Sequence, residues 1–204
     1  MKQSLVKRVG LLVIGLAILG SMIGFFVFLD LGIDPVTATN LGLSMVKGLS
    51  FGSVTAMAQL LMFIPVWLKR RDLVGVGTVI AMLSIGYIIE YSALMWRMLI
   101  VWELSWMLRL VLLLLGMNVL GVAISVMLVA NLGITAYDGL GFAVVELTGG
   151  RVSFRTARVA MDMMFVVIGF SLGAPIGIAT LVTMCLVGPI VNFYKGSVAK
   201  RINL

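Results

Sequence analysis

The chain has 204 residues, of which 62% are hydrophobic and only 11% are charged, and its formal net charge is +7. Soluble proteins average about 45–50% apolar and about 25% charged residues, so this composition excludes an ordinary soluble domain and predicts an integral membrane protein. One cysteine and no histidine are present, which excludes an internal disulfide and metal sites built on cysteine or histidine. The basic residues lie at the ends of apolar runs, which indicates membrane anchoring rather than nucleic-acid binding.

Long apolar segments predict the membrane spans in chain order. Val9–Leu29 carries no charge over 21 residues, which is longer than the roughly 7–15 residues of a signal-peptide core and predicts a retained first span. Gly48–Leu68 and Leu73–Ile89 predict the second and third spans, and Trp102–Asn131 predicts the fourth.

The last apolar stretch predicts two spans. Phe154–Tyr194 is too long for a single helix, and Gly173-Ala174-Pro175 interrupts it with a turn signal. The chain is therefore expected to cross the membrane six times.

Two shorter segments interrupt this series after the first and fourth spans. Pro35–Val46 follows the stretch LGIDPVTATN, and Tyr137–Leu147 begins within the similar stretch LGITAYDGLG. A helix of about 12 residues reaches only about 18 Å, too little to cross a hydrocarbon core. Both segments are expected to be half-helices that enter the membrane and return, or lie at its edge.

The distribution of lysine and arginine predicts the orientation of these spans. With the N-terminus in the cytoplasm, only Lys47, Arg97 and Arg109 lie outside. The other twelve lie inside: Lys2, Lys7, Arg8, Lys69, Arg70, Arg71, Arg151, Arg155, Arg158, Lys195, Lys200 and Arg201. This bias predicts that both termini are cytoplasmic.

The two halves of the chain resemble each other. Leu31-Gly32-Ile33 matches Leu132-Gly133-Ile134, Ser50–Phe63 resembles Ser153–Phe165, and Gly77–Tyr91 resembles Ala179–Phe193, with offsets of about 101 to 103 residues. Each half then holds three spans and one half-helix. Because three is odd, the second copy is expected to be inserted upside down, as in many secondary transporters. Chance similarity between apolar sequences is the alternative.

Polar side chains at equivalent places in the two halves predict a substrate-binding site. The starts of the half-helices present free N–H groups and a positive dipole end that favour an anionic group. We predict that eight residues line the site: Asp34, Thr37, Asn40, Gln59, Tyr137, Asp138, Arg158 and Asp162. The alternative at the helix starts is that Asp34 and Thr135 only cap them.

Asp162 is the strongest single candidate, because an intramembrane carboxylate is costly and normally faces a wet interior. It occupies the position equivalent to Gln59. The alternative role is a local ion pair with Arg158, which lies four residues earlier on the same helical face.

The motifs of the first half resemble those of the YczE-type bacterial membrane proteins, which are related to the YitT and YyaS proteins. The chain keeps Pro35, Gly42-Leu43-Ser44 and Gly75-Val76-Gly77-Thr78 of that pattern, but has Val36-Thr37 where Trp-Asp is typical. Tyr137-Asp138 carries the aromatic-acid pair in the second half. The resemblance implies a bacterial inner-membrane protein and supplies no substrate.

Together these observations predict an all-α membrane protein of six helices in two inverted three-helix repeats. The expected organisation is one transmembrane domain, with repeats at about 9–93 and 104–194, a connecting segment at about 94–103 and a cytoplasmic tail at 195–204.

The expected function is secondary transport or export of a small solute, for which the half-helix starts favour an anion. Two alternatives stay open: a substrate-binding subunit of an energy-coupling-factor importer, and a non-transporting accessory protein. We expect no enzyme, cofactor, metal or nucleic acid. The expected partners are the lipid bilayer and a small-molecule substrate, with a coupling ion or proton and a homo-oligomer left open.

Overall fold

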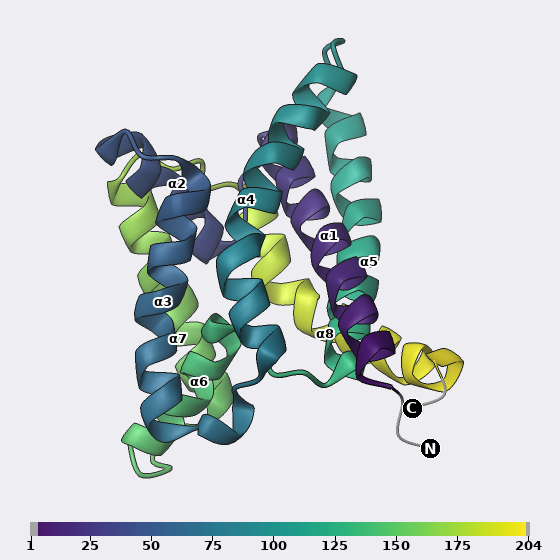
Figure 1. Cartoon of the computed structure of the whole chain (residues 1–204). Helices are drawn as coiled ribbons and strands as arrows, with labels where there is room; N and C mark the ends of the chain where they lie inside the picture. Colours follow the sequence, from purple (N-terminus) through teal and green to yellow (C-terminus); the bar gives the residue numbers. More distant parts are fainter. Residues whose placement is uncertain (1–3, 203–204) are drawn as a thin grey trace.

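A computed structural model describes residues 4–202, and within this range the chain is all-helical, without strands. Eight α-helices and one 3-10 turn follow one another between these limits (Figure 1). They are α1 (Leu5–Leu29), α2 (Pro35–Lys47), α3 (Phe51–Lys69), η1 (Arg71–Leu73), α4 (Val76–Leu99), α5 (Trp106–Ala130), α6 (Ala136–Leu147), α7 (Phe154–Ser171) and α8 (Ile178–Ile202).

The helix boundaries follow local signals in the sequence. Ser, Thr or Asp precedes most helices and accepts a hydrogen bond from a first-turn N–H group, as at Ser50, Thr135 and Ser153. Helices α1 and α5 both end in a residue with left-handed backbone, Asp30 (φ 53°) and Asn131 (φ 49°). These residues turn the chain sharply into the half-helices.

Five helices of the described chain are long and apolar enough to cross a membrane, namely α1, α3, α4, α5 and α8. The half-helices α2 and α6 have 13 and 12 residues, which is too short to cross, as expected. Helix α7 does not meet the same criterion because its 18 residues include Arg155, Arg158 and Asp162. The chain is therefore a multi-pass membrane protein, and the sixth span stays a prediction.

Some predicted boundaries differ from those of the structure. Helix α4 continues to Leu99, so the connecting segment is shorter than predicted. Helix α8 continues to Ile202, through most of the segment predicted as a tail. Gly188-Pro189 lies inside this helix and does not end it, so the apolar and basic residues share one helix. Residues 203–204 of the predicted tail, and Lys2 among the predicted cytoplasmic charges, lie outside the described residues.

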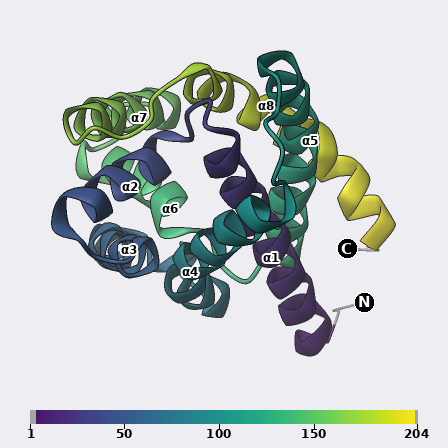
Figure 2. The same ribbon diagram turned by 90° about the horizontal axis from the view of Figure 1, so that it is seen from above.

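The helices form two groups, which Figures 1 and 2 show side by side. One group contains α1, α4, α5 and α8, and its main apolar core includes Leu16, Ile85 and Leu120. The other contains α2, α3, α6 and α7, around a smaller cluster with Val36, Met62 and Ala136. Both half-helices therefore lie in the second group, together with the charged helix α7.

Helices α1 and α5 run antiparallel and hold each other's ends. Arg8, near the start of α1, donates to the carbonyl of Ala130 at the end of α5 (2.7 Å) and to that of Asn131. Arg109, near the start of α5, donates to the carbonyl of Leu29 at the end of α1 (3.1 Å). A guanidinium at a helix C-terminus satisfies free carbonyls and complements the helix dipole.

The close packing between α1 and α5 also occurs twice. A Cβ atom at Gly15 would lie 2.5 Å from Cγ of Met127, and one at Gly116 would lie 2.7 Å from Cε1 of Phe26. The two contacts exchange equivalent positions of the halves, as do the two arginine contacts. The two halves therefore make reciprocal contacts along α1 and α5.

Truncating Arg109 tests the strength of these helix-end contacts. We expect Arg109→Ala to lower the free energy of unfolding by about 1–3 kcal/mol, because the buried end of α1 loses a charged donor. Reversible unfolding in detergent, followed by circular dichroism, measures the change. Arg97→Ala is the matched control, since Arg97 is exposed near the end of α4. Equal stability of the two variants would contradict a role for the Arg109 contact.

Backbone hydrogen bonds fix the two loops that lead from one helix group into the half-helices. The backbone N–H of Ala179, at the start of α8, donates to the carbonyl of Leu31 (3.0 Å). The N–H of Gly77, at the start of α4, donates to the carbonyl of Leu132 (2.8 Å). Each half-helix is thus preceded by a loop that is fixed to the first turn of a helix in the other half.

The turn between α3 and α4 carries the KRR cluster. Arg70 donates from Nε and Nη2 to the two carboxylate oxygens of Asp72 (2.9 and 2.8 Å). This guanidinium holds the pKa of the exposed Asp72 carboxyl below its usual range. In Figure 1 this turn lies at the same end of the molecule as the start of α1 and the α6–α7 connection, while the α4–α5 connection lies at the opposite end.

Candidate functional site

Four of the predicted site residues meet where α6 contacts α7. Tyr137 and Asp138 lie in the first turn of α6, and Arg158 and Asp162 lie one turn apart on α7. We call these four residues the charged group. Helix α6 packs on α7 within the second helix group, so the half-helix and the charged helix α7 contribute to the same place.

Arg158 is the centre of the charged group. Its Nη1 atom lies 2.5 Å from Oδ1 of Asp138, and its Nε atom lies 3.7 Å from Oδ2 of Asp162. Its guanidinium carbon also lies 4.0 Å from the centroid of the Tyr137 ring, which is within range of a cation–π interaction. The local pair with Asp162 that the sequence predicts is therefore present, but the shorter contact is to Asp138.

Asp162 is the most buried acidic side chain of the charged group. The residue is 8% exposed, and besides Arg158 its carboxylate accepts a hydrogen bond from the Tyr137 hydroxyl. A buried carboxylate is stable only when it is paired and hydrogen-bonded. Helix α6 thus provides two groups to this pair. The Tyr137 hydroxyl donates a hydrogen bond to Asp162, and the Asp138 carboxylate competes with Asp162 for Arg158.

The starts of the half-helices are capped by their own side chains. The Asp34 carboxylate accepts from the N–H of Thr37 (3.1 Å). Thr135 accepts from the N–H of Asp138 (3.1 Å) and donates its hydroxyl to Oδ2 of Asp138 (2.8 Å). The predicted capping roles are confirmed, and these first-turn donors already have a partner.

Asp34 brings the first half of the chain to the same place. Its carboxyl lies close enough for its charge to interact with those of Asp162 and Arg158. Thr39 of α2 donates to the carbonyl of Phe165 on α7 (2.6 Å), which ties the two helices together. The first half of the chain therefore packs on α7, the helix that carries Arg158 and Asp162.

The other predicted site residues, Thr37, Asn40 and Gln59, are not part of the charged group. Thr37 and Asn40 are buried, and Nδ2 of Asn40 lies 3.4 Å from the Thr55 hydroxyl on α3. Gln59 shares a face of α3 with Met62, and its Oε1 atom is buried without a partner in the described part of the chain. No hydrogen bond between described residues joins Asn40 or Gln59 to the charged group.

Phe165 is a residue of the site that sequence reasoning missed. Its ring lies 5.6 Å from that of Tyr137, edge to face, and so helps to orient the hydroxyl that contacts Asp162. It is one apolar residue in an apolar run, and no local signal distinguishes it. Its position depends on how α6 packs against α7.

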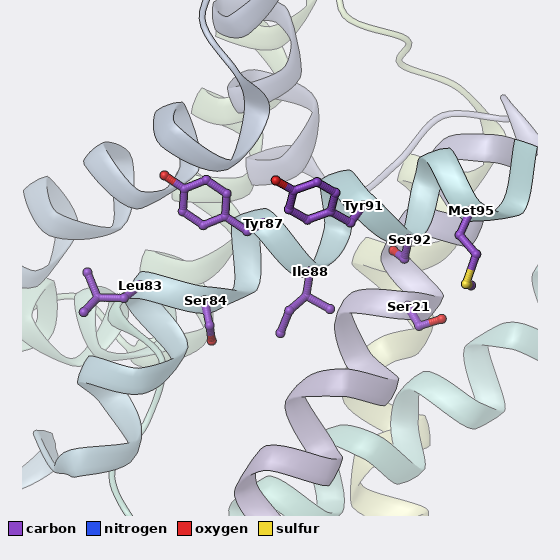
Figure 3. A pocket seen from close by; sticks show the side chains of 8 residues that line it. All are labelled: Ser21, Leu83, Ser84, Tyr87, Ile88, Tyr91, Ser92 and Met95. Atoms are coloured by element: carbon purple, nitrogen blue, oxygen red, sulfur yellow. The ribbon is translucent and has the colours of Figure 1, made fainter.

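Two surface recesses of the described structure lie elsewhere. The larger has a volume of about 810 Å³ and lies between α1 and α4, where Ser21, Tyr87 and Tyr91 contribute to its wall (Figure 3). The other lies where Gly133 crosses Gly75, with Asp72 and Lys195 at its rim. Neither includes Asp138 or Asp162, so the predicted cavity beside them stays a prediction. No group of three metal-ligating side chains occurs among residues 4–202.

The fold and the apolar helices define a multi-pass helical membrane protein with charged side chains inside one of its helix groups. The chain belongs to the DUF6198 family, a family of unknown function, whose model matches residues 6–196. It is 28% identical to the uncharacterized membrane protein YczE of Bacillus subtilis, over 95% of this chain and 87% of that protein. It is 22% identical to an uncharacterized protein of Haemophilus influenzae, over 95% of this chain and 86% of that protein. No solved structure matches the chain. The predicted likeness to YczE-type proteins is thus confirmed.

Proposed function

We propose that the chain crosses a bacterial cytoplasmic membrane six times as two inverted three-helix repeats. The exchanged contacts of Arg8 and Arg109, and of Leu31 and Leu132, support this arrangement because they are reciprocal. The antiparallel course of α1 and α5 supports inversion of the second repeat. Helix α7 is then the sixth span, with Arg158 and Asp162 facing α6 rather than lipid.

The protein acts in this proposal as a small secondary transporter or exporter. The observation that carries it is the buried Asp162 carboxylate, held by Tyr137 of a half-helix and by Arg158. Discontinuous helices beside a membrane-embedded charge form the substrate or ion sites of many inverted-repeat transporters. The protein has no catalytic role in this proposal.

The charges favour a proton or a cationic solute over an anionic one. Two carboxylates, those of Asp138 and Asp162, pair with one cation, Arg158, in the charged group. In each half-helix one first-turn N–H group, that of Thr37 or of Asp138, already donates to the capping side chain, Asp34 or Thr135. An anionic solute would have to displace Asp138 from Arg158.

A ligand screen followed by a flux measurement tests transport. We expect some small cationic solutes to raise the melting temperature of the purified protein, and proteoliposomes to accumulate them when a pH gradient is imposed. Liposomes without protein are the control for leakage. Flux that equals this leakage for every stabilising solute would contradict the proposal.

Two other functions give different results in simple experiments. A substrate-binding subunit of an energy-coupling-factor importer would co-purify with an ATPase complex and would not transport alone. An accessory protein would tolerate neutralisation of Asp162 without functional loss.

The topology is tested by cysteine labelling from each side of the membrane. In a Cys185→Ser background, we expect an impermeant maleimide to label Met95→Cys in intact cells, and Arg71→Cys only after permeabilisation. The expectation follows from the concentration of Lys and Arg at the end that carries the termini. Labelling of Arg71→Cys in intact cells would invert the proposed orientation.

A further inference from the structure

One pair of neighbouring helices packs in the first half of the chain but not in the second. The pairs α1–α4 and α5–α8 both pack closely, as do α2–α3 and α6–α7, and α2–α7 and α3–α6. Helix α3 also packs along α4, whereas α7 and α8 make at most marginal contact in the described structure (Figure 2). The two halves thus differ at a single helix pair.

The α3–α4 contact is close and includes a charged hydrogen bond. The N–H of Gly52, in the first turn of α3, donates to Oε2 of Glu90 on α4 (2.8 Å). The Tyr87 ring lies against Gly52, and a Cβ atom at Gly86 would lie 2.7 Å from Cβ of Thr55. This end of the molecule, opposite to the termini, is therefore closed.

The equivalent positions of the second half are apart. Gly188 occupies the place of Gly86, Asn192 that of Glu90 and Arg155 that of Gly52. Both Asn192 and Arg155 are exposed, and within the described residues nothing lies within 4 Å of a Cβ atom at Gly188. A glycine inside a helix costs about 1 kcal/mol relative to alanine, and in this conformation no neighbour requires it.

In a protein built from inverted repeats, a difference between the two halves can define one conformational state. In such a protein, the second state is reached when the two repeats exchange their local conformations around a fixed site. The two helix groups are joined by the segments α1–α2, α3–α4, α5–α6 and α7–α8. In such an exchange one group rocks against the other about these segments.

We infer that the structure is one of two alternating states, closed between α3 and α4 and open between α7 and α8. In the other state α7 closes on α8 at Gly188, while α3 leaves α4 and the Gly52–Glu90 hydrogen bond breaks. This inference rests on the proposed transport function and topology, under which the present state is open to the cytoplasm. Access to Asp162 then alternates between the two sides.

Spin-label distances in lipid nanodiscs test the exchange, in a Cys185→Ser background. One label pair replaces Arg155 and Asn192, and the second replaces Ser53 and Tyr91 in the first half. We expect the second-half pair to show a long and a short distance. Glu90→Ala should raise the population with the short distance, relative to that with the long distance, by roughly tenfold or more. The reason is that it removes a hydrogen bond to a charged group, which holds α3 against α4. The first-half distance should lengthen in the same variant.

Matched variants separate the exchange from general loosening. Glu103→Ala removes an exposed carboxylate of the α4–α5 connection and should leave the ratio unchanged. Gly188→Leu fills the space needed for closure and should abolish the short distance, whereas Gly196→Leu, with equally open surroundings on α8, should not. Gly188→Leu adds its side chain where the present state has no neighbour, so it keeps the test valid if Glu90→Ala fails to fold.

A single distance in the second-half pair that neither Glu90→Ala nor Gly188→Leu alters would overturn the inference. If proteoliposomes transport a solute while the protein shows only this single distance, the transport proposal is supported and the exchange of conformations is contradicted. If the protein shows two interconverting distances but transports no stabilising solute, the two states are supported and the transport proposal is contradicted.

Discussion

Asp162→Asn is expected to abolish coupled transport while the protein still folds and inserts. The asparagine side chain keeps the shape of Asp162 and an acceptor for the Tyr137 hydroxyl, but it carries neither a charge nor a titratable proton. Arg158 retains Asp138 as its closer partner at 2.5 Å, so the cation is not left unpaired. We expect gradient-driven uptake into proteoliposomes to fall to roughly the level of protein-free vesicles, as is typical when an intramembrane coupling carboxylate is removed.

Asp72→Asn is the matched control for this variant. Asp72 lies in the exposed turn between α3 and α4 and pairs with Arg70, far along the chain from the charged group. It should transport at the wild-type rate. Wild-type coupling in Asp162→Asn, with both variants equally well folded, would return Asp162 to a structural role.

Gly133→Ala is expected to have the largest effect on stability. Gly133 has φ +107°, a conformation that side chains rarely adopt, and it lies where the loop before α6 crosses the start of α4. A Cβ atom there would lie 2.6 Å from the backbone nitrogen of Gly75 and would also collide with the Thr78 hydroxyl. Because backbone cannot move aside cheaply, we expect a loss of about 4 kcal/mol or more, at the upper end of single substitutions.

Gly149→Ala separates backbone strain from this collision. Gly149 also has positive φ (61°), but in the described structure nothing lies within 4 Å of the position that its Cβ atom would take. It should therefore lose only about 1 kcal/mol from the left-handed conformation. Thermal unfolding and the yield of membrane-inserted protein measure both variants. Comparable losses in the two would show that the crossing with Gly75 does not limit stability.

Much of the helix framework follows from local sequence. Apolar segments of about 20 residues between caps and turns predict the long helices, and Asp34 and Thr135 mark the starts of α2 and α6. The repeated LGI segments predict that the chain breaks twice in the same way. These features depend on hydrophobicity, capping and backbone preference over a few residues, so pattern reading finds them.

Local sequence patterns predict fewer of the side-chain contacts within the site. The i,i+4 spacing predicts Arg158 with Asp162, because both lie on one helix. The shorter pair, Arg158 with Asp138, and the hydrogen bond of Tyr137 to Asp162 join residues 20 and 25 positions apart. They exist because α6 folds back against α7, and hydrophobic periodicity does not specify which helices pack together.

The sequence alone therefore determined the membrane class, the helices, their breaks and the charged residues, since each depends on the composition of a short segment. Tertiary structure alone decided that Arg8 and Arg109, which charge counting assigns to membrane surfaces, hold the ends of a partner helix. It also decided that α3 packs on α4 while α7 stands apart from α8. Such contacts join segments far apart in the chain, such as Arg8 and Asn131, which are 123 residues apart. Their free energy depends on the packing of whole helices rather than on any local pattern.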